Sequence, residues 1–164
     1  MNGQKKKSSE PPVLSRILER AVRLPLRSTT KMGVIDELID ILLDLDLITD
    51  KEEVFNDVMA REQEKSTGLE KGVAVPHAKT NGVQNLHLAV GISPRGIDFG
   101  AFDNQVSRIF FLILCPPDQP NQHIKALQEI AFLVSDEHFR TALLNAVDPA
   151  GVIKVLQDYL RKAS

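Results

Sequence analysis

Cysteine and long apolar segments are scarce in this sequence. The chain of 164 residues has one cysteine, Cys115, and therefore no partner for an internal disulfide. The sequence carries no sign of an oxidising compartment, so we expect a cytoplasmic protein. The longest uninterrupted apolar run, residues 109–115, is far too short to cross a bilayer. Charged residues interrupt residues 13–24, where a signal peptide would need an apolar core, so no direct membrane insertion is expected.

An excess of one charge sign is also lacking. Lysine and arginine number 20 against 22 aspartates and glutamates, the net charge is −2, and the two signs are interspersed. This balance removes the usual electrostatic reason to expect a nucleic-acid or anionic-membrane partner. No glycine pattern matches a P-loop or a dinucleotide fingerprint, so no nucleotide cofactor is expected.

The length of the chain predicts one domain. Residues 1–12 are polar and end in two prolines, which predicts disorder because such a segment buries too little apolar surface to offset ordering. We expect a leader over residues 1–20, disordered or partly helical, and a folded domain over residues 21–164. Strands alternate with helices that cover both faces of a sheet, so the predicted class is α/β with a single domain.

Apolar spacing places the elements of this domain. Strands are predicted at residues 73–75, ending at Pro76-His77, at residues 86–91, ending at Ser93-Pro94, and at residues 109–114, with an edge strand at residues 22–26 because of Pro25. Helices are predicted after Ser28-Thr29-Thr30, after Thr49, after Asn121, after Ser135 and after Asp148. Thr49 and Glu52 fit a capping box, and Asn121 is the expected cap of the third helix.

His77 is the first candidate functional residue. It follows Pro76 at a predicted strand end, and Arg61, Ser66 and Thr67 lie a few residues upstream as hydrogen-bond donors. A histidine changes protonation near neutral pH, which suits it to catalysis. A loop histidine bonded to nearby backbone fits the same pattern, and the spacing leaves both interpretations open.

His123 is predicted in the first turn of a helix, where unpaired backbone N–H groups favour anions and disfavour an imidazolium. Taken alone, it is expected to be a capping or surface residue. His87 is expected to be solvent-facing or hydrogen-bonded on a strand, and His138 to lie at the surface. Cys115 is expected to be a small core residue and not a nucleophile.

The chain resembles a known family in the region of these candidates. Arg61-Glu62, Ser66-Thr67-Gly68 and residues 72–77 (GVAVPH) resemble the active-site segment of the fructose/mannitol-type enzyme IIA domains of the bacterial phosphotransferase system, which include the nitrogen-regulatory enzyme IIA proteins. The likeness runs from about residue 24 to residue 160, and it includes residues 96–99 (GIDF) and His123 followed by Ile124 and Leu127. Two departures are the charged pair Glu70-Lys71, where small residues are expected in many members of the family, and residues 1–20, which match no pattern that we can place.

The resemblance implies a mixed sheet flanked by helices and a phosphoryl group received on His77. The donor would be the phosphohistidine of the histidine-containing phosphocarrier protein, and in sugar-transport members the next acceptor is a cysteine of an enzyme IIB. By the same likeness, His123 would face His77 in a shallow, exposed depression and stabilise the phosphoryl group, with Arg61 beside it. The hydroxyls and amides of Ser66 and Thr67 are candidates for further phosphoryl contacts.

Alternatives remain at this point. A transport component and a nitrogen-regulatory binding module switched by phosphorylation of His77 both fit, because added phosphate changes surface charge. A metal site on His77 and His123 is the weaker alternative, since two histidines without a third close ligand bind zinc poorly. Transfer between two histidines needs no metal, so no metal and no cofactor are expected.

Overall fold

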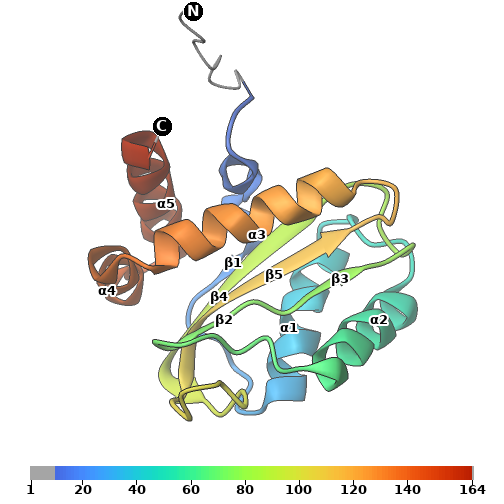
Figure 1. Cartoon of the computed structure of the whole chain (residues 1–164), viewed down its shortest axis with the longest axis horizontal. Helices are drawn as coiled ribbons and strands as arrows, with labels where there is room; N and C mark the ends of the chain where they lie inside the picture. The colour runs from blue at the N-terminus through green and yellow to red at the C-terminus, as the bar shows by residue number, and fades with distance from the viewer. Residues whose placement is uncertain (1–9, 164) are drawn as a thin grey trace, which may run out of the picture.

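A five-stranded mixed sheet forms the centre of the protein in a computed structural model, which describes residues 10–163 (Figure 1). The strand order is β1 (Val22–Arg23), β4 (His87–Ile97), β5 (Ser107–Cys115) and β2 (Val73–Ala74), and β3 (His77–Lys79) pairs with β5 beyond β2 on the same edge. Strands β2 and β3 run parallel to β5, β4 runs antiparallel to it, and β1 is parallel to β4. The predicted edge position of the strand near Pro25 is confirmed by β1.

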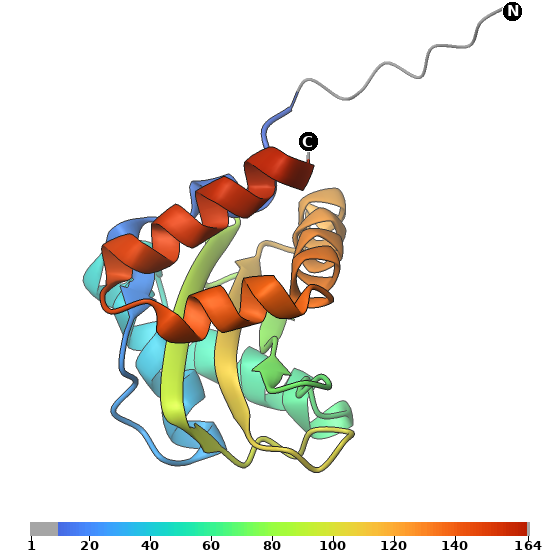
Figure 2. The ribbon, with the colours of Figure 1, turned by 90° about the vertical axis from the view of Figure 1, so that its left-hand side faces the viewer.

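Helices cover both faces of this sheet (Figure 2). Helices α1 (Lys31–Asp44) and α2 (Lys51–Glu64) pack on one face, and α3 (Pro120–Val134), α4 (Glu137–Asn145) and α5 (Pro149–Ala163) pack on the other. Side chains of β5 alternate between the two cores, with Phe111 and Ile113 facing α3 and Phe110 and Leu112 facing α1. This arrangement confirms the predicted α/β class with a mixed sheet in a single domain.

Two predicted helix caps are wrong. Asp50 caps α2, because its carboxylate accepts a hydrogen bond of 3.0 Å from the Glu53 amide. The Thr49 hydroxyl instead donates to the Gly82 carbonyl at 3.0 Å, so the predicted Thr49 capping box does not form. Helix α3 begins at Pro120 without a side-chain cap, ahead of Asn121, since proline suits the first helical position. The predicted cap of α1 near Thr30 is confirmed, with its hydroxyl accepting from the Gly33 amide.

Two predicted strand ends are wrong as well. The strand at residues 73–75 stops at Ala74, and after Pro76 the chain enters β3 at His77. His77 therefore begins a paired strand, where we predicted it to follow the end of one. Strand β4 continues through Ser93-Pro94 because its register against β5 breaks between Ile92 and Ile97, and such an irregularity accommodates a proline.

The segment before β1 packs on α3. Two short 3₁₀ helices, Val13–Arg16 and Glu19–Ala21, precede β1, and the Val13 and Leu14 amides donate to the Glu129 carboxylate at 2.9 and 3.0 Å. The side chains of Val13 and Leu14 are buried in the core on the α3 face. Disorder is predicted for residues 1–12, of which residues 1–9 lie outside the described residues. Within residues 10–163, every helix is too short or too polar to traverse a lipid bilayer.

Candidate active site

His77 lies at the β3 edge of the sheet, where the two helical layers meet. Ala78 points into the core under α1 and α2, and alternation along β3 therefore turns His77 toward α3. Helix α2 brings Arg61 to this edge from its last turn, and α3 brings His123 from its first turn. Together these elements line a depression of about 430 Å³, whose lining residues are Asp57, Ala60, Arg61, Glu64, His77, Ala78, Lys79 and His123.

One backbone contact sets the orientation of the His77 ring. Nδ1 lies 2.7 Å from the Val75 carbonyl oxygen, which can only accept, so Nδ1 carries the proton and donates it. Nε2 then keeps its lone pair. Burial of the half-buried ring lowers the pKa of His77 and the nearby Arg61 guanidinium lowers it further, against the opposing effects of the Val75 bond and the Glu62 carboxylate. His77 is therefore a neutral imidazole with an unprotonated Nε2 at neutral pH.

His123 packs against His77 from the other side of the depression. The ring centroids are 5.3 Å apart with an interplanar angle of 60°, which confirms that the two histidines approach each other. The His123 side chain is buried, and its Nδ1 has no hydrogen-bond partner among the described residues. Burying an unpaired nitrogen lone pair costs less free energy than burying an unpaired N–H. The ring proton of His123 therefore belongs on Nε2, and Nδ1 carries only its lone pair. His123 is thus a hydrogen-bond donor at its other nitrogen.

Burial lowers the pKa of His123 to about 4, together with repulsion from Lys79, from Arg61 and from His77 once that ring is protonated at acidic pH. The unfolded chain binds this proton at its usual pKa, so the unfolded state carries more protons between about pH 6.5 and pH 4. The free energy of unfolding is expected to fall by about 2 kcal/mol from pH 7 to pH 5, with His77 acting in the same direction. Urea unfolding at the two pH values measures this loss, and His123→Phe should remove most of it; an undiminished loss in that variant would refute the assignment.

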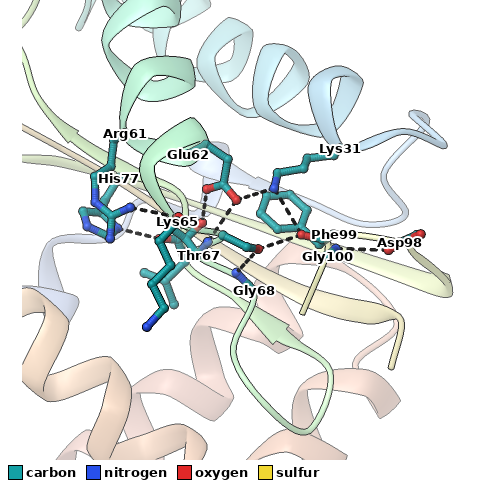
Figure 3. Close-up of polar contacts among 12 residues, drawn as sticks. Lys31, Arg61, Glu62, Lys65, Thr67, Gly68, His77, Asp98, Phe99 and Gly100 are labelled. Carbon is teal, nitrogen blue, oxygen red and sulfur yellow. Dashed lines mark hydrogen bonds and ion pairs between the residues drawn. The ribbon is translucent and has the colours of Figure 1, made fainter. Parts of the chain in front are cut away.

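Arg61 and Thr67 are drawn with His77 in Figure 3, and Ser66 lines a depression together with these three residues. Arg61 Nη1 donates to the Lys65 carbonyl at 2.9 Å. The Ser66 hydroxyl donates to the Phe99 carbonyl at 2.8 Å, and the Thr67 hydroxyl donates to the buried Glu62 carboxylate. A phosphoryl contact from either hydroxyl would require it to exchange these partners. Both residues nevertheless line, with Arg61 and His77, a second depression on the α3 side of the site.

The remaining candidates lie away from this site or carry structural roles. His138 is exposed in α4, His87 is half-buried at the start of β4, and Cys115 is fully buried, as predicted for a core residue. Burial raises the pKa of the Cys115 thiol, which makes it a poor nucleophile. In the part of the chain that the structure describes, no group of three or more histidine, cysteine, aspartate or glutamate side chains is arranged to hold a metal ion.

Glu62 is a buried residue of the site for which the sequence predicted no role. Its signal is visible in the sequence, because Val54, Val58 and Glu62 follow one another at intervals of four residues on the buried face of α2. A carboxylate on an apolar helix face is rarely buried without a partner, so a hydrogen-bond or ion-pair partner is expected for Glu62.

Comparison with known proteins supports one family. The model of the family described as "Phosphoenolpyruvate-dependent sugar phosphotransferase system, EIIA 2" matches residues 16–159. The fructose-specific EIIA component of Haloferax volcanii is 33% identical over 129 residues, which are 79% of this chain and 84% of that protein. The fructose-specific EIIABC component of Bacillus subtilis is 30% identical over 143 residues, 87% of this chain, and the chain spans only 22% of that larger protein.

Solved structures agree with this result. The crystal structure of the nitrogen regulatory protein IIA-Ntr from Neisseria meningitidis superposes with a TM-score of 0.81 at 25% identity, covering 88% of this chain and 99% of that one. The sheet with helices on both faces is thus a feature of a shared fold. This chain belongs to the EIIA 2 family of the phosphoenolpyruvate-dependent sugar phosphotransferase system.

Proposed function

We propose that this protein is a phosphocarrier that accepts a phosphoryl group on Nε2 of His77. The donor is the phosphohistidine of the histidine-containing phosphocarrier protein, and the next acceptor is an enzyme IIB. The observation that carries the proposal is the bond of 2.7 Å between His77 Nδ1 and the Val75 carbonyl, which leaves Nε2 unprotonated beside an open depression. Family membership supplies the phosphotransferase context.

The transfer step uses few protein groups. The Nε2 lone pair of His77 forms the new N–P bond while the N–P bond of the donor breaks, and the donor imidazole takes back its electron pair. The Nδ1 proton stays on His77, bonded to Val75. The positive charge that this leaves on the ring is offset by the phosphoryl oxygens, and it makes the ring a good leaving group for transfer to the next protein.

His123 and Arg61 stabilise the phosphoryl oxygens in this proposal. His123 is neutral at pH 7 and offers an N–H donor from the first turn of α3, where backbone N–H groups also favour an anion. Arg61 provides a planar set of donors and a permanent charge, although one of its nitrogens is bonded to Lys65. Ser66 and Thr67 remain candidates for phosphoryl contact through hydroxyls that are now bonded to the protein.

A regulatory role is the second candidate. The likeness to IIA-Ntr of Neisseria meningitidis, at a TM-score of 0.81, favours it as much as the fructose-specific relatives favour transport. In that role, the phosphoryl group would add negative charge at the depression and change which partner proteins bind there. The chemistry at His77 would be the same, and only the fate of the phosphoryl group would differ.

Incubation with ³²P-labelled phosphorylated carrier protein tests the proposal. We expect acid-labile phosphate on one residue, His77, and a ¹⁵N–³¹P coupling that places phosphorus on Nε2. Phosphate on another residue, or on Nδ1, would overturn the proposed mechanism. Addition of an enzyme IIB then separates the two roles, because a transport component loses its label to the IIB cysteine while a regulatory module retains it.

A further inference from the structure

Glu62 is a buried charge for which the phosphocarrier mechanism has no use. Its residue is 5% exposed, near the end of α2 and beneath the loop of residues 65–68. Burying a carboxylate costs several kcal/mol unless it is paired and hydrogen-bonded. The partners that offset this cost therefore indicate which part of the structure Glu62 stabilises.

The Glu62 carboxylate joins α1 to the loop beside His77 (Figure 3). Its Oε1 lies 2.5 Å from Lys31 Nζ and accepts from the Thr67 amide at 2.9 Å, and its Oε2 accepts from the Thr67 hydroxyl. Lys31 is itself held, because Nζ donates to the Phe99 carbonyl at 3.2 Å and lies 4.8 Å from the centroid of the Phe99 ring. Glu62 thus accepts hydrogen bonds from both polar hydrogens of Thr67. Its negative charge is balanced by the Lys31 ammonium, which is held in place by Phe99.

A series of hydrogen bonds runs from this carboxylate to the His77 ring. The Thr67 carbonyl accepts from the Val75 amide at 3.0 Å, and the Val75 carbonyl accepts from His77 Nδ1 at 2.7 Å. Thr67 and Val75 are each held at both the backbone N–H and the backbone C=O, so the position of one residue limits the position of the other. Displacement of Thr67 would move Val75, whose carbonyl selects the tautomer of His77.

We propose that Glu62, with its charge balanced by Lys31, is a positioning residue for His77. It fixes Thr67 and, through the backbone of Val75, keeps the His77 proton on Nδ1 and Nε2 directed at the depression. The effect on phosphoryl transfer rests on the proposed function, whereas the effect on the ring itself does not. Second-layer contacts of this kind orient ligating and catalytic histidines in many sites.

The test compares Glu62→Gln with Glu52→Gln, a change of the same chemistry at an exposed position in the first turn of α2. Side-chain ¹⁵N spectra near pH 7 report the tautomer of His77. We expect the Nδ1–H form to dominate in the wild type and in Glu52→Gln, and to give way to a mixture in Glu62→Gln. The rate of transfer from phosphorylated carrier protein should fall roughly 10- to 100-fold in Glu62→Gln alone, because small displacements of a reacting group are costly.

Two further variants keep the proposal testable if Glu62→Gln does not fold. Lys31→Met removes the charge that balances Glu62 and should change both the tautomer and the rate, whereas Lys51→Met, which breaks ion pairs with Asp36 and Asp40, should leave both at the wild-type values. A Glu62→Gln protein with a lower melting temperature but an unchanged tautomer and rate would overturn the proposal, since Glu62 would then be only structural. If the wild type is not phosphorylated on His77, the proposed function fails, and the tautomer comparison still decides the role of Glu62.

Discussion

Replacing His77 with glutamine is expected to abolish phosphoryl acceptance. The glutamine amide can still donate toward the Val75 carbonyl, so the edge of the sheet should remain folded, but it has no nucleophilic nitrogen lone pair. Loss of a nucleophile typically lowers the rate by roughly 10⁴-fold or more. The measurement is acid-labile phosphate bound per chain after incubation with phosphorylated carrier protein.

The control for this change is His138→Gln. His138 is exposed at the start of α4, outside the depression, so its replacement should leave labelling at the wild-type level. His123 is not expected to substitute for His77, because its Nδ1 is buried and its other nitrogen carries the ring proton. Equal labelling of His77→Gln and the wild type would show that the phosphoryl acceptor lies elsewhere.

Replacing His123 with phenylalanine is expected to slow transfer by about 10²- to 10³-fold, the effect of removing one preorganised donor to a developing anion. Phenylalanine fills the buried volume next to His77 but offers no N–H. The variant should fold at least as stably at neutral pH, because it also removes a buried nitrogen without a partner. Single-turnover transfer and thermal unfolding, measured together, separate the two effects.

His123→Gln is the matched variant for this prediction. Its amide keeps an N–H donor near the same position, so part of the rate should return relative to His123→Phe. Transfer by His123→Phe at the wild-type rate would show that His123 packs against His77 without acting on the phosphoryl group. Arg61 would then be the principal group available to the phosphoryl oxygens at this depression.

Local sequence patterns predicted most of the helices and strands. They failed where a residue distant in the sequence formed the hydrogen bond that the pattern assigned to a neighbour. Helix α1 and its Thr30 cap follow from apolar spacing and a nearby hydroxyl, and both are observed. The Thr49 cap failed because its hydroxyl bonds to Gly82, which lies 33 residues away, and Asp50 took its place. The β3 strand was missed because His77 enters it only by pairing with Ile113 of β5, a contact that no periodicity in residues 73–79 encodes.

The residues of the candidate site were recognisable for a different reason. Arg61, Ser66, Thr67 and His77 lie within one continuous segment, residues 61–77, so their resemblance to a family motif can be seen directly in the sequence. His123 entered through the same resemblance, and its approach to His77 depends on the packing of α3 against the sheet. No role was predicted for Glu62 in that segment, because its partner Lys31 and the Phe99 carbonyl that holds Lys31 are distant in the sequence.

By itself, the sequence determined the α/β class, the family resemblance and the nucleophile candidate at Pro76-His77. These properties rest on local spacing and residue type, which a single chain displays directly. Only the tertiary structure decided which His77 nitrogen is free, that His123 is buried and neutral, and that Glu62 holds the Thr67–Val75 segment. Protonation and orientation depend on burial and on partners brought together from separate parts of the chain, and those exist only after folding.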